Sequence, residues 1–544
     1  MPSWQLEERD PYRKRAKAEN DNLGGELMIT AEFLELPAAI CPDRPAVIFE
    51  GKRYSFSQLN DRVNRLAAFL ADAGIKKGDR VAIIQVNCNH CVETYFATSK
   101  LGAIFLPLNF RAKEDELEYM INFAEAKAIF VGGRYQEMIN RLKPRLNTVK
   151  DYIAIEGSYP GMLSYEELLN NTPSADITED VTDDDVTILM YTAGTTGKPK
   201  GVMLTHRSFC VYVLDNVSPP DPEQHEVTIL SVPLYHVAGI QAMMSAIYGG
   251  RTLVMQRQFE AKGWMELVEK EKVNRAMMVP TMLKQLMDHP DFGKYDLSSL
   301  KIITYGGASM PISVLKKALE VFPGVSFINA FGQTETAATI TMLSPEDHII
   351  SGTDEEKEKK LRRLTSIGKP LPDVEMKVID ENGNELPAGQ IGEIIARGPR
   401  IMAGYFKDEA RTSATIDRDG WIHTGDMGYR DEDGYYYLSG RATDLIKRGG
   451  EYISPEELEN VICTHPKVED VAVIGVYDEE WGEVPRAICV LKDGADCTEE
   501  EIIEYCHSRL ASFKRPRSVI FVEELPRNPM GKVLKRVLRE KYGK

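Results

Sequence analysis

Tyr191-Thr-Ala-Gly-Thr-Thr-Gly-Lys-Pro-Lys-Gly201 is the stretch around which the rest of this chain is organised. It follows an apolar run, 186–190, that predicts a buried strand, and it precedes 202–206, where we expect a helix to begin. Its three glycines let the backbone approach an anion closely, and successive backbone N–H groups can form a nest for phosphate oxygens. Three threonines and two lysines add donors and positive charge. The stretch therefore predicts a polyphosphate-binding loop.

This loop differs from the Walker loop of P-loop NTPases, which needs four residues between its glycine and its Gly-Lys pair. Here two residues separate Gly194 from Gly197, and a proline follows Lys198. A mobile polar surface loop is the alternative that composition alone allows. The two lysines also differ, because Lys200 is the better phosphate contact, whereas Lys198, beside the proline, is expected to be solvated.

The composition predicts a globular protein of several structural units. A chain of 544 residues suggests three or four units, and 43% hydrophobic with 27% charged residues is ordinary for such proteins. No apolar run reaches the roughly 18 residues that a membrane helix needs. Residues 1–23 lack the apolar core of a secretory signal. We therefore expect no transmembrane segment and a cytoplasmic location, and we allow for a homodimer.

Charge and cysteine content exclude two classes of function. The net charge of −17 argues against nucleic-acid binding in general, although eleven Lys/Arg against three Asp/Glu in 509–544 suit a small polyanion or a solvated helix face. Eight cysteines in a chain this long do not form a disulfide framework. Only Cys88-Asn-His-Cys91 clusters, and we interpret it as buried thiols rather than a metal site, because no further ligand group has matching spacing.

Two runs of alternating strands and helices flank the loop. Short apolar runs predict the strands, and apolar residues at helical spacing predict the segments between them. Strands are expected at 81–84, 104–107 and 128–131 before the loop, and at 227–231, 252–255, 275–279, 301–304 and 326–329 after it. Such alternation is typical of parallel sheets covered on both faces, so an α/β fold with two βα subdomains follows.

The pattern changes after about residue 365. Asp-x-x-Gly turns recur at 380–383, 417–420 and 431–434 with short β runs between them, which predicts a β-rich third subdomain. Beyond residue 440 the chain is a small α+β unit of about 100 residues, enough for a core of its own. We therefore expect a large N-terminal domain at 1–440, a hinge at 441–444 and a C-terminal domain at 445–544.

Four further stretches carry polar groups that a fold alone does not require. Asn329-Ala-Phe-Gly-Gln-Thr-Glu335 follows a predicted strand, and ligands of open α/β sheets bind beyond the carboxyl ends of strands. Glu335 can hold Mg²⁺ on a phosphate, although it also suits the first turn of a helix. Asp426, in the second stretch, can accept both hydroxyls of a ribose, although it also suits a turn. The remaining stretches are 439–447 and 528–532.

In this order and spacing the five stretches resemble the adenylate-forming superfamily, and specifically its acyl-CoA synthetases. The resemblance extends from about residue 30 to the end of the chain. It implies that a carboxylate attacks the α-phosphate of Mg-ATP and displaces pyrophosphate, after which the acyl-adenylate reacts with the thiol of coenzyme A. Catalysis would rest on positioning and charge neutralisation, without a covalent enzyme intermediate.

The resemblance also implies roles for the matching residues. The loop would hold the β- and γ-phosphates through Thr192, Gly194, Thr195, Thr196, Gly197 and Lys200. Thr334 would contact the α-phosphate, and Glu335, together with Thr192, would bind Mg²⁺. The adenine would lie against Gly307, Ala308, Ser309, Asn329, Ala330, Phe331 and Gly332.

The C-terminal part of the pattern would serve the ribose and the two half-reactions. Asp426 and Arg441 would take the ribose hydroxyls. Lys532 would place a mobile positive charge between the attacking carboxylate and the α-phosphate, although it also belongs to a basic tail. Rotation of the small domain about Thr443, where the family usually has Asp or Lys, would bring in the coenzyme A residues. These would be Lys447, Gly449 and Gly450, with Arg448, Lys514 and Arg515 near the phosphates.

The acyl group is expected near 233–239, where His236 would close over the reacting carboxylate or pack as a structural histidine at a helix start. Small residues there leave room for an apolar acid. We favour a medium or longer fatty acid, with an aromatic or alicyclic acid as the alternative. A luciferase-type oxygenase, an amino-acid-activating domain and a non-catalytic nucleotide-binding regulator are the competing functions. The last is disfavoured by Lys532, Glu335 and the loop lysines.

Overall fold

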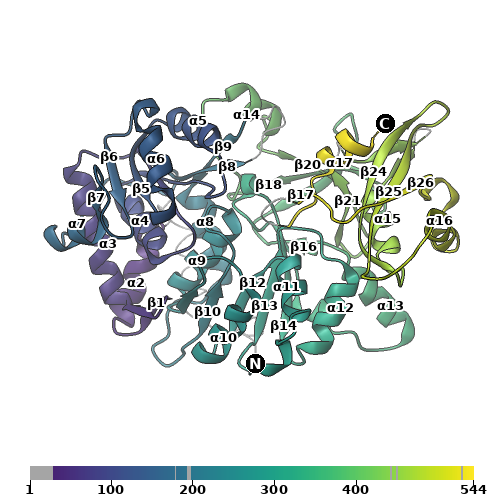
Figure 1. The fold of residues 1–544 in the computed structure, drawn as a ribbon, viewed down its shortest axis with the longest axis horizontal. Coiled ribbons are helices and arrows are strands. Elements are labelled where there is room, and N and C mark those ends of the chain that lie inside the picture. Colours follow the sequence, from purple (N-terminus) through teal and green to yellow (C-terminus); the bar gives the residue numbers. More distant parts are fainter. Residues whose placement is uncertain are drawn as a thin grey trace.

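The computed structural model describes residues 28–177, 179–192, 198–441, 444–448, 451–527 and 531–543. Its first α/β layer is an eight-stranded sheet, at the left of Figure 1, with helices on both faces. The strands, in spatial order, are β19 (Gly404–Tyr405), β9 (Lys200–Thr205), β8 (Val186–Thr192), β4 (Ile104–Pro107), β3 (Arg80–Ile84), β5 (Ala126–Val131), β6 (Asp151–Ala154) and β7 (Leu163–Ser164). The helices are α3 (Phe56–Asp72), α4 (Asn89–Lys100), α5 (Glu114–Ala124), α6 (Gln136–Leu142), α7 (Tyr165–Asn171) and α8 (His206–Asn216).

The second layer is a nine-stranded sheet with a mostly parallel centre. Its strands are β16 (Lys369–Pro370), β15 (Thr341–Leu343), β14 (Ser326–Phe331), β13 (Ile302–Gly306), β12 (Arg275–Met278), β10 (Val227–Leu230), β11 (Thr252–Met255), β1 (Pro45–Phe49) and β2 (Lys52–Ser55). Its helices include α2 (Glu32–Ile40), α9 (Val237–Tyr248), α10 (Ala261–Glu271), α11 (Pro280–Met287) and α12 (Ile312–Val321). The hairpin β1–β2 precedes the first layer in sequence, yet Val47 pairs with Leu253 in the second.

One expectation about the organising loop is wrong. Residues 202–205 are not helical, because Lys200–Thr205 form β9, which pairs antiparallel with β8, and the helix α8 starts only at the last residue of the predicted stretch, His206. Thr192 pairs with Lys200 at the end of this ladder. The predicted loop is therefore the tip of a β-hairpin, and both ends of the hairpin are held by the sheet.

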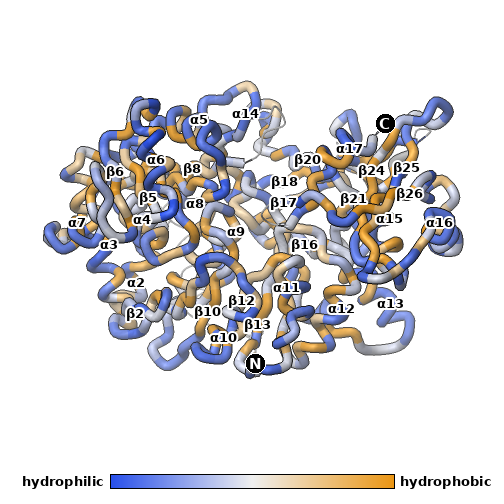
Figure 2. The backbone as a smooth tube through the Cα atoms, viewed as in Figure 1, coloured by the Kyte–Doolittle hydropathy of each residue, from blue (hydrophilic) through white to orange (hydrophobic). Residues whose placement is uncertain are grey.

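One face of the nine-stranded sheet is buried, and the other is half-buried. Along β12 and most of β13, and at the start of β14, buried residues alternate with half-buried ones, as side chains on successive residues of a strand point to opposite faces. The buried set, which includes Met278, Tyr305 and Phe327, packs with residues of α10, α11 and α12. Figure 2 shows the corresponding apolar segments inside this layer. The half-buried set faces a cavity.

The predicted β-rich unit is a four-stranded antiparallel sheet of β17 (Glu375–Ile379), β18 (Gly392–Arg397), β20 (Ile422–Arg430) and β21 (Tyr436–Arg441). The turn glycines Gly383, Gly420 and Gly434 have φ of 83°, 80° and 85°, the left-handed region that hairpin turns require. The helices α13 (Asp354–Arg363) and α14 (Glu409–Thr415) bury none of their residues.

The C-terminal unit is a five-stranded sheet with three helices, at the right of Figure 1. The strands are β22 (Ile446–Arg448), β23 (Glu451–Ile453), β24 (Val468–Asp478), β25 (Gly482–Leu491) and β26 (Ser518–Phe521), and the helices are α15 (Pro455–Ile462), α16 (Glu499–His507) and α17 (Lys535–Tyr542). The Ser454 side chain accepts a hydrogen bond from the Glu457 amide, as expected of an N-cap. The C-terminal unit contacts the large part here: Lys284 Nζ of α11 lies 2.6 Å from Glu469 Oε1 of β24.

These layers confirm the predicted fold class, a large α/β part with two βα layers and a β-rich sheet, followed by a small α+β unit. Among the described residues, no helix is both long and apolar enough to cross a membrane.

Candidate functional site

A cavity of about 2260 Å³ lies where the two large sheets, the β-rich sheet and the C-terminal unit meet. Ten of the residues predicted for the site line it: Thr192, Lys200, His236, Gly307, Ala330, Gly332, Thr334, Glu335, Arg441 and Lys532. Gly194, Thr195, Thr196 and Gly197, together with Thr443, Gly449 and Gly450, lie outside the described residues. The folded chain thus brings together residues separated by more than 300 positions in sequence.

Lys200 and Glu335 form an ion pair at the hairpin end of the cavity. Lys200 Nζ lies 2.6 Å from Glu335 Oε1, and the Tyr405 hydroxyl lies 2.7 Å from the amine and 3.0 Å from the same carboxylate oxygen. Burial lowers the pKa of the Lys200 amine, but Glu335 and Tyr405 outweigh burial and the pKa is raised. The amine is therefore held in its cationic form.

Two side chains at this corner can contact a bound phosphate or its metal ion. The Thr192 hydroxyl is buried and has no hydrogen-bond partner among the described residues. Glu335 is only 6% exposed, and its carboxylate faces the cavity. A carboxylate and a hydroxyl are oxygen ligands of the kind that Mg²⁺ prefers. The lysine supplies a charge that a phosphate can share.

The backbone of 332–338 is shaped tightly around this corner. A side chain at Gly332 would bring its Cβ within 1.4 Å of the Ala338 carbonyl oxygen, so only glycine fits. Ala337 and Ala338 have φ of 47° and 83°, which is strained for residues with a side chain. The Thr336 hydroxyl accepts from the Gln333 amide and holds the turn. The strain keeps Thr334 and Glu335 at the cavity wall.

Asp426 and Arg441 pair across neighbouring strands of the β-rich sheet. They are register partners in β20 and β21, and Arg441 Nε lies 2.8 Å from Asp426 Oδ1 in an ion pair. Arg441 Nη1 also donates to the Thr424 carbonyl over 2.8 Å. Burial raises the pKa of Asp426, while Arg441 and Lys532 oppose that rise. Asp426 itself stands behind Arg441 rather than on the cavity surface.

Lys532 reaches the same cavity from the C-terminal unit. Gly531 has a φ of 76°, and a side chain there would collide with Thr281 of the large part, whose atoms lie 2.5 Å from the Cβ position. Burial, followed by the charge of Arg441, lowers the pKa of the Lys532 amine, whereas Asp426 raises it. The C-terminal unit is thus docked with its lysine inside the cavity.

His236 is the N-cap of α9 and lines the cavity. Its Nε2 is buried and has no hydrogen-bond partner among the described residues. Burial lowers the pKa of His236 to about 4, so the ring is neutral at pH 7. A neutral ring with an unused nitrogen can exchange a hydrogen bond with a bound carboxylate, which favours the functional interpretation of this histidine over the structural one.

The remaining described residues predicted for the site do not line the cavity. Ala308 and Ser309 follow Gly307 without lining the cavity, Phe331 packs against the core, and Asn329 Nδ2 donates to the Ser366 carbonyl over 3.2 Å. Lys447 is exposed on β22 and its backbone amide donates to Glu483, outside the cavity. Of the residues predicted for coenzyme A, the described ones, Lys447, Arg448, Lys514 and Arg515, do not line this cavity.

Sequence reasoning missed several residues of the site. Tyr405 bridges Lys200 and Glu335 from the two-residue strand β19, which has no local signal. Gln333 Nε2 donates to the Thr424 carbonyl over 3.4 Å and ties two motifs together. Gln241 Oε1 accepts from the amide and hydroxyl of Thr339, both at 3.3 Å, beside the second half of the cavity.

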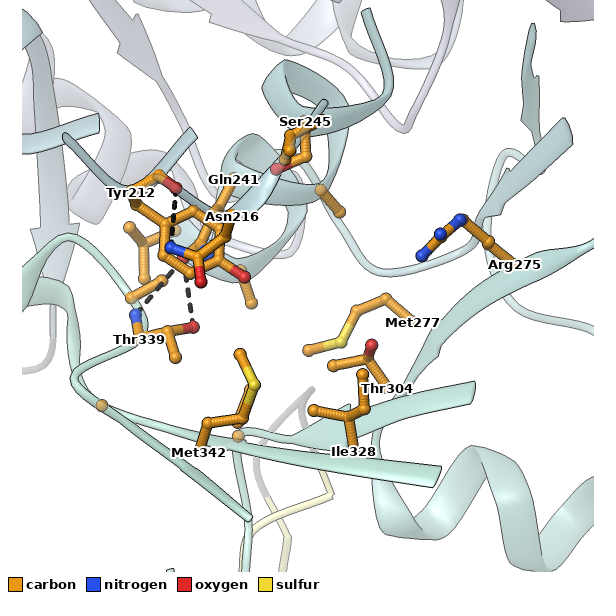
Figure 3. A pocket seen from close by; sticks show the side chains of 18 of the residues that line it. Tyr212, Asn216, Gln241, Ser245, Arg275, Met277, Thr304, Ile328, Thr339 and Met342 are labelled. Carbon is orange, nitrogen blue, oxygen red and sulfur yellow. Dashed lines mark hydrogen bonds between the residues drawn. The ribbon is translucent and has the colours of Figure 1, made fainter. Parts of the chain in front are cut away.

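This second half extends away from the charged corner along the nine-stranded sheet (Figure 3). Met277, Thr304 and Ile328 form one side, and Tyr212, Gln241 and Ser245 of the helices α8 and α9 lie opposite them, with Met342 near the lower edge of the view. Arg275 points toward the space between these walls. The extension is a compartment with both polar and apolar lining residues, and it joins the charged corner.

Known proteins match the whole of this architecture. The model of the AMP-binding enzyme family matches residues 34–406, and that of the AMP-binding enzyme C-terminal domain matches 457–532. A long-chain-fatty-acid–CoA ligase, FadD13 of Mycobacterium tuberculosis, is 32% identical over 90% of this chain and 93% of its own length. A feruloyl-CoA synthase of an Amycolatopsis species is 34% identical over 93% and 97%.

Solved structures agree with these matches. ATP-bound MatB from Rhodopseudomonas palustris superposes with a TM-score of 0.82 at 29% identity, over 95% of this chain and 99% of that one. The anthranilate CoA ligase AuaEII in complex with anthranoyl-AMP superposes with a TM-score of 0.85 at 25% identity, over 95% and 98%. The charged corner and its apolar extension are thus set in a fold that these proteins share.

Proposed function

The chain belongs to the family of AMP-binding enzymes, and on that premise we propose that it joins a medium-chain or longer fatty acid to coenzyme A. It is an AMP-forming acid–thiol ligase, and its reaction uses ATP, Mg²⁺ and coenzyme A. The acid displaces pyrophosphate from ATP to give an acyl-adenylate, and the thiol of coenzyme A then displaces AMP. The observation that supports the substrate proposal is the compartment that opens from the charged corner, where Met277, Ile328 and Met342 offer apolar surface.

The charged corner supports phosphate-binding roles for its residues. Lys200 and Thr192 are assigned to the phosphates that leave, with Thr334 at the α-phosphate. Glu335 and Thr192 would hold Mg²⁺, which supplies positive charge against the phosphate oxygens. The chain's own part is to keep donors in place before the nucleotide arrives, which reduces the reorganisation needed during reaction.

Lys532 is assigned to the first half-reaction. It lines the same cavity as Arg441 and the compartment of the acid, so it can neutralise charge as the carboxylate approaches the α-phosphate. His236 is assigned to the carboxylate itself. Arg441, which lines the cavity, and its ion-pair partner Asp426 are assigned to the ribose. The N-terminal domain at 1–440, the hinge at 441–444 and the C-terminal domain at 445–544 remain our proposal for the units that move.

The walls of the compartment support an aliphatic chain. Met277, Ile328 and Met342 offer flexible or branched apolar surface. The likeness to a feruloyl-CoA synthase supports the alternative, an aromatic acid. Both acids would use the same charged corner. A luciferase-type oxygenase would share the adenylation step and is the least favoured function.

We also propose a cytoplasmic location. All eight cysteines are free, and seven of them are buried, as expected in a reducing compartment. A homodimer is our working assembly, to be tested by analytical ultracentrifugation.

Pyrophosphate release over a panel of acids tests the substrate proposal. Saturated fatty acids of graded length, benzoate and hydroxycinnamate analogues, and alicyclic acids would be compared by kcat/KM in the presence of Mg-ATP and coenzyme A. A fatty acid should give the highest kcat/KM. A higher value for an aromatic acid would transfer the proposal to the alternative class, and no release with any acid would refute the ligase assignment.

A further inference from the structure

The floor of the acyl compartment is built in three rows across the parallel strands. The register aligns Thr228, Arg275, Ile302 and Ser326 in the first row, Met277, Thr304 and Ile328 in the second, and Gly306 with Ala330 in the third. The third row lies at the carboxyl ends of the strands, beside the charged corner. The first row therefore lies about 13 Å farther along the sheet, since four residues of a strand span roughly that distance.

The helix α9 provides the opposite wall and leads to the same end. Its cavity residues recur at helical spacing: Ala238, Gln241, Ala242, Ser245 and, just past its end, Gly249. His236 stands at the start of this helix, near the chemistry. At 1.5 Å per residue, the distance from Ala238 to Gly249 is about 16 Å. Arg251 follows two residues later, so both walls place an arginine at the distal end.

Two arginines share one carboxylate there. Arg275 Nε lies 2.7 Å from Glu226 Oε2, and Arg251 Nε lies 2.9 Å from the same oxygen. The side chains of Arg251 and Arg275 are 14% and 26% exposed. Burial and the charge of Arg275 lower the pKa of Arg251 to about 10, which still leaves it cationic at pH 7. One carboxylate thus faces two cations, and the cluster carries a net positive charge.

An unused hydroxyl accompanies the two cations. Thr228 is register partner of Arg275, so its side chain points to the same face of the sheet. The residue is 7% exposed, and its Oγ1 has no hydrogen-bond partner among the described residues. A buried polar group normally has a partner, so an orphan beside a cation indicates a missing acceptor. The other charged residues at this end of the cavity are Asp221, which is half-buried, and Lys301 and Glu346, which are exposed to solvent.

We propose that Arg275, Arg251 and Thr228 bind a second carboxylate of the substrate, so that the preferred acid is a long dicarboxylic acid. This inference rests on the proposed acid–CoA ligase function and specifies its substrate class. One carboxylate reacts at the charged corner, the aliphatic chain lies against Met277 and Ile328, and the other carboxylate accepts hydrogen bonds at the distal end. The preference should be greatest for the chain length that separates the two carboxylates by about 13 Å.

The test compares matched acids with the full-length enzyme. Unbranched α,ω-dicarboxylic acids of graded length, their monomethyl esters and the corresponding monocarboxylic acids would be assayed for pyrophosphate release. The wild type should show at least a tenfold higher kcat/KM for the diacid of optimal length than for its ester. Arg275→Gln should lower kcat/KM for that diacid by about 10- to 100-fold, the usual effect of losing a hydrogen bond to a charged group. Its kcat/KM for the monocarboxylic acid should stay within about threefold.

Arg53→Gln is the matched control. Arg53 lies on β2 at the far edge of the same sheet, where its half-exposed side chain pairs with the largely buried Glu271. Because Arg53 does not line the cavity, its loss should leave the ratio of diacid to monoacid unchanged. Equal kcat/KM for diacid and ester in the wild type would overturn the proposal without any variant, and so would an unchanged ratio in Arg275→Gln. Pyrophosphate release with monocarboxylic acids in that case would leave the ligase function standing, whereas no release with any acid would refute that function.

Discussion

Lys200→Met should weaken both the folded protein and its affinity for Mg-ATP, whereas Lys198→Met should do neither. Lys200 is 22% exposed and its partner Glu335 only 8%, so the change leaves a buried carboxylate without its counter-charge. Removing one partner of a buried ion pair costs about 3 to 5 kcal/mol, and the residual exposure of the lysine favours the lower value. For a cooperative unit of roughly 400 residues, about 3 kcal/mol corresponds to a fall in Tm of about 3 to 4 °C.

The effect on the nucleotide follows from the same geometry. Losing a charged contact to a phosphate should raise the Kd of Mg-ATP by about 10- to 100-fold. Isothermal titration calorimetry would measure the Kd, and differential scanning calorimetry the Tm. Lys198 is exposed, and its described side-chain contact is with the Tyr119 ring, 5.2 Å away, so its replacement is the control. Equal effects of the two replacements on Tm and Kd would refute the assignment of Lys200.

The Tm shift caused by Mg²⁺ provides a second test of the Lys200→Met variant. Without Lys200 the Glu335 carboxylate lacks its counter-charge, so Mg²⁺ alone should raise the Tm of Lys200→Met more than that of the wild type. An identical shift in both proteins would argue against Glu335 as the metal ligand.

Three further predictions concern other parts of the molecule. Lys532→Ala should abolish acyl-adenylate formation but spare thioester formation from supplied acyl-adenylate; equal loss of both half-reactions, measured separately, would exclude the assigned role. Burial and Glu459 raise the pKa of Glu456 to about 7, so the folded state should lose stability as pH rises from about 4.5 to 7, and Glu456→Gln should flatten the urea midpoints over that range. A wild-type midpoint that rises over that range would contradict this. Arg400 is fully buried and donates to both oxygens of Asp373, so Arg400→Met should lower the free energy of unfolding by about 3 to 5 kcal/mol; a loss under 1 kcal/mol in urea unfolding would contradict it.

Local sequence signals were sufficient where the deciding interactions are themselves local. Gly74 ends the helix α3 with a φ of 82°, and Glu50-Gly51 turn the first hairpin with both φ positive, as their sequence patterns predict. The strands of the parallel sheets were also predictable, because buried strands are short apolar runs bounded by turns.

The strand β9 shows why the other elements could not be predicted from local sequence. The run Val-Met-Leu-Thr suits a helix or a strand, and only its pairing with β8 decides between them. Tyr405 enters the site because its strand pairs with β9 at Val202, some 200 residues away in sequence. Arg275 did carry a signal, a charged residue at the start of an otherwise apolar strand, but its partners Glu226 and Arg251 come from other segments. Such groupings depend on register, which a single sequence does not reveal.

The pairing of β1 with β11 has a consequence for synthesis of the chain on the ribosome. Val47 must wait for Leu253, 206 residues later, before its strand can join the sheet. At about 5 to 20 residues per second, that delay is roughly 10 to 40 s. During this time the backbone groups along the outer edges of the hairpin β1–β2 have no strand to pair with. Two exposed positive charges on β2, Lys52 and Arg53, discourage pairing of the hairpin with another nascent chain. The segment that is made first therefore joins the nine-stranded sheet only after β11 has been synthesised.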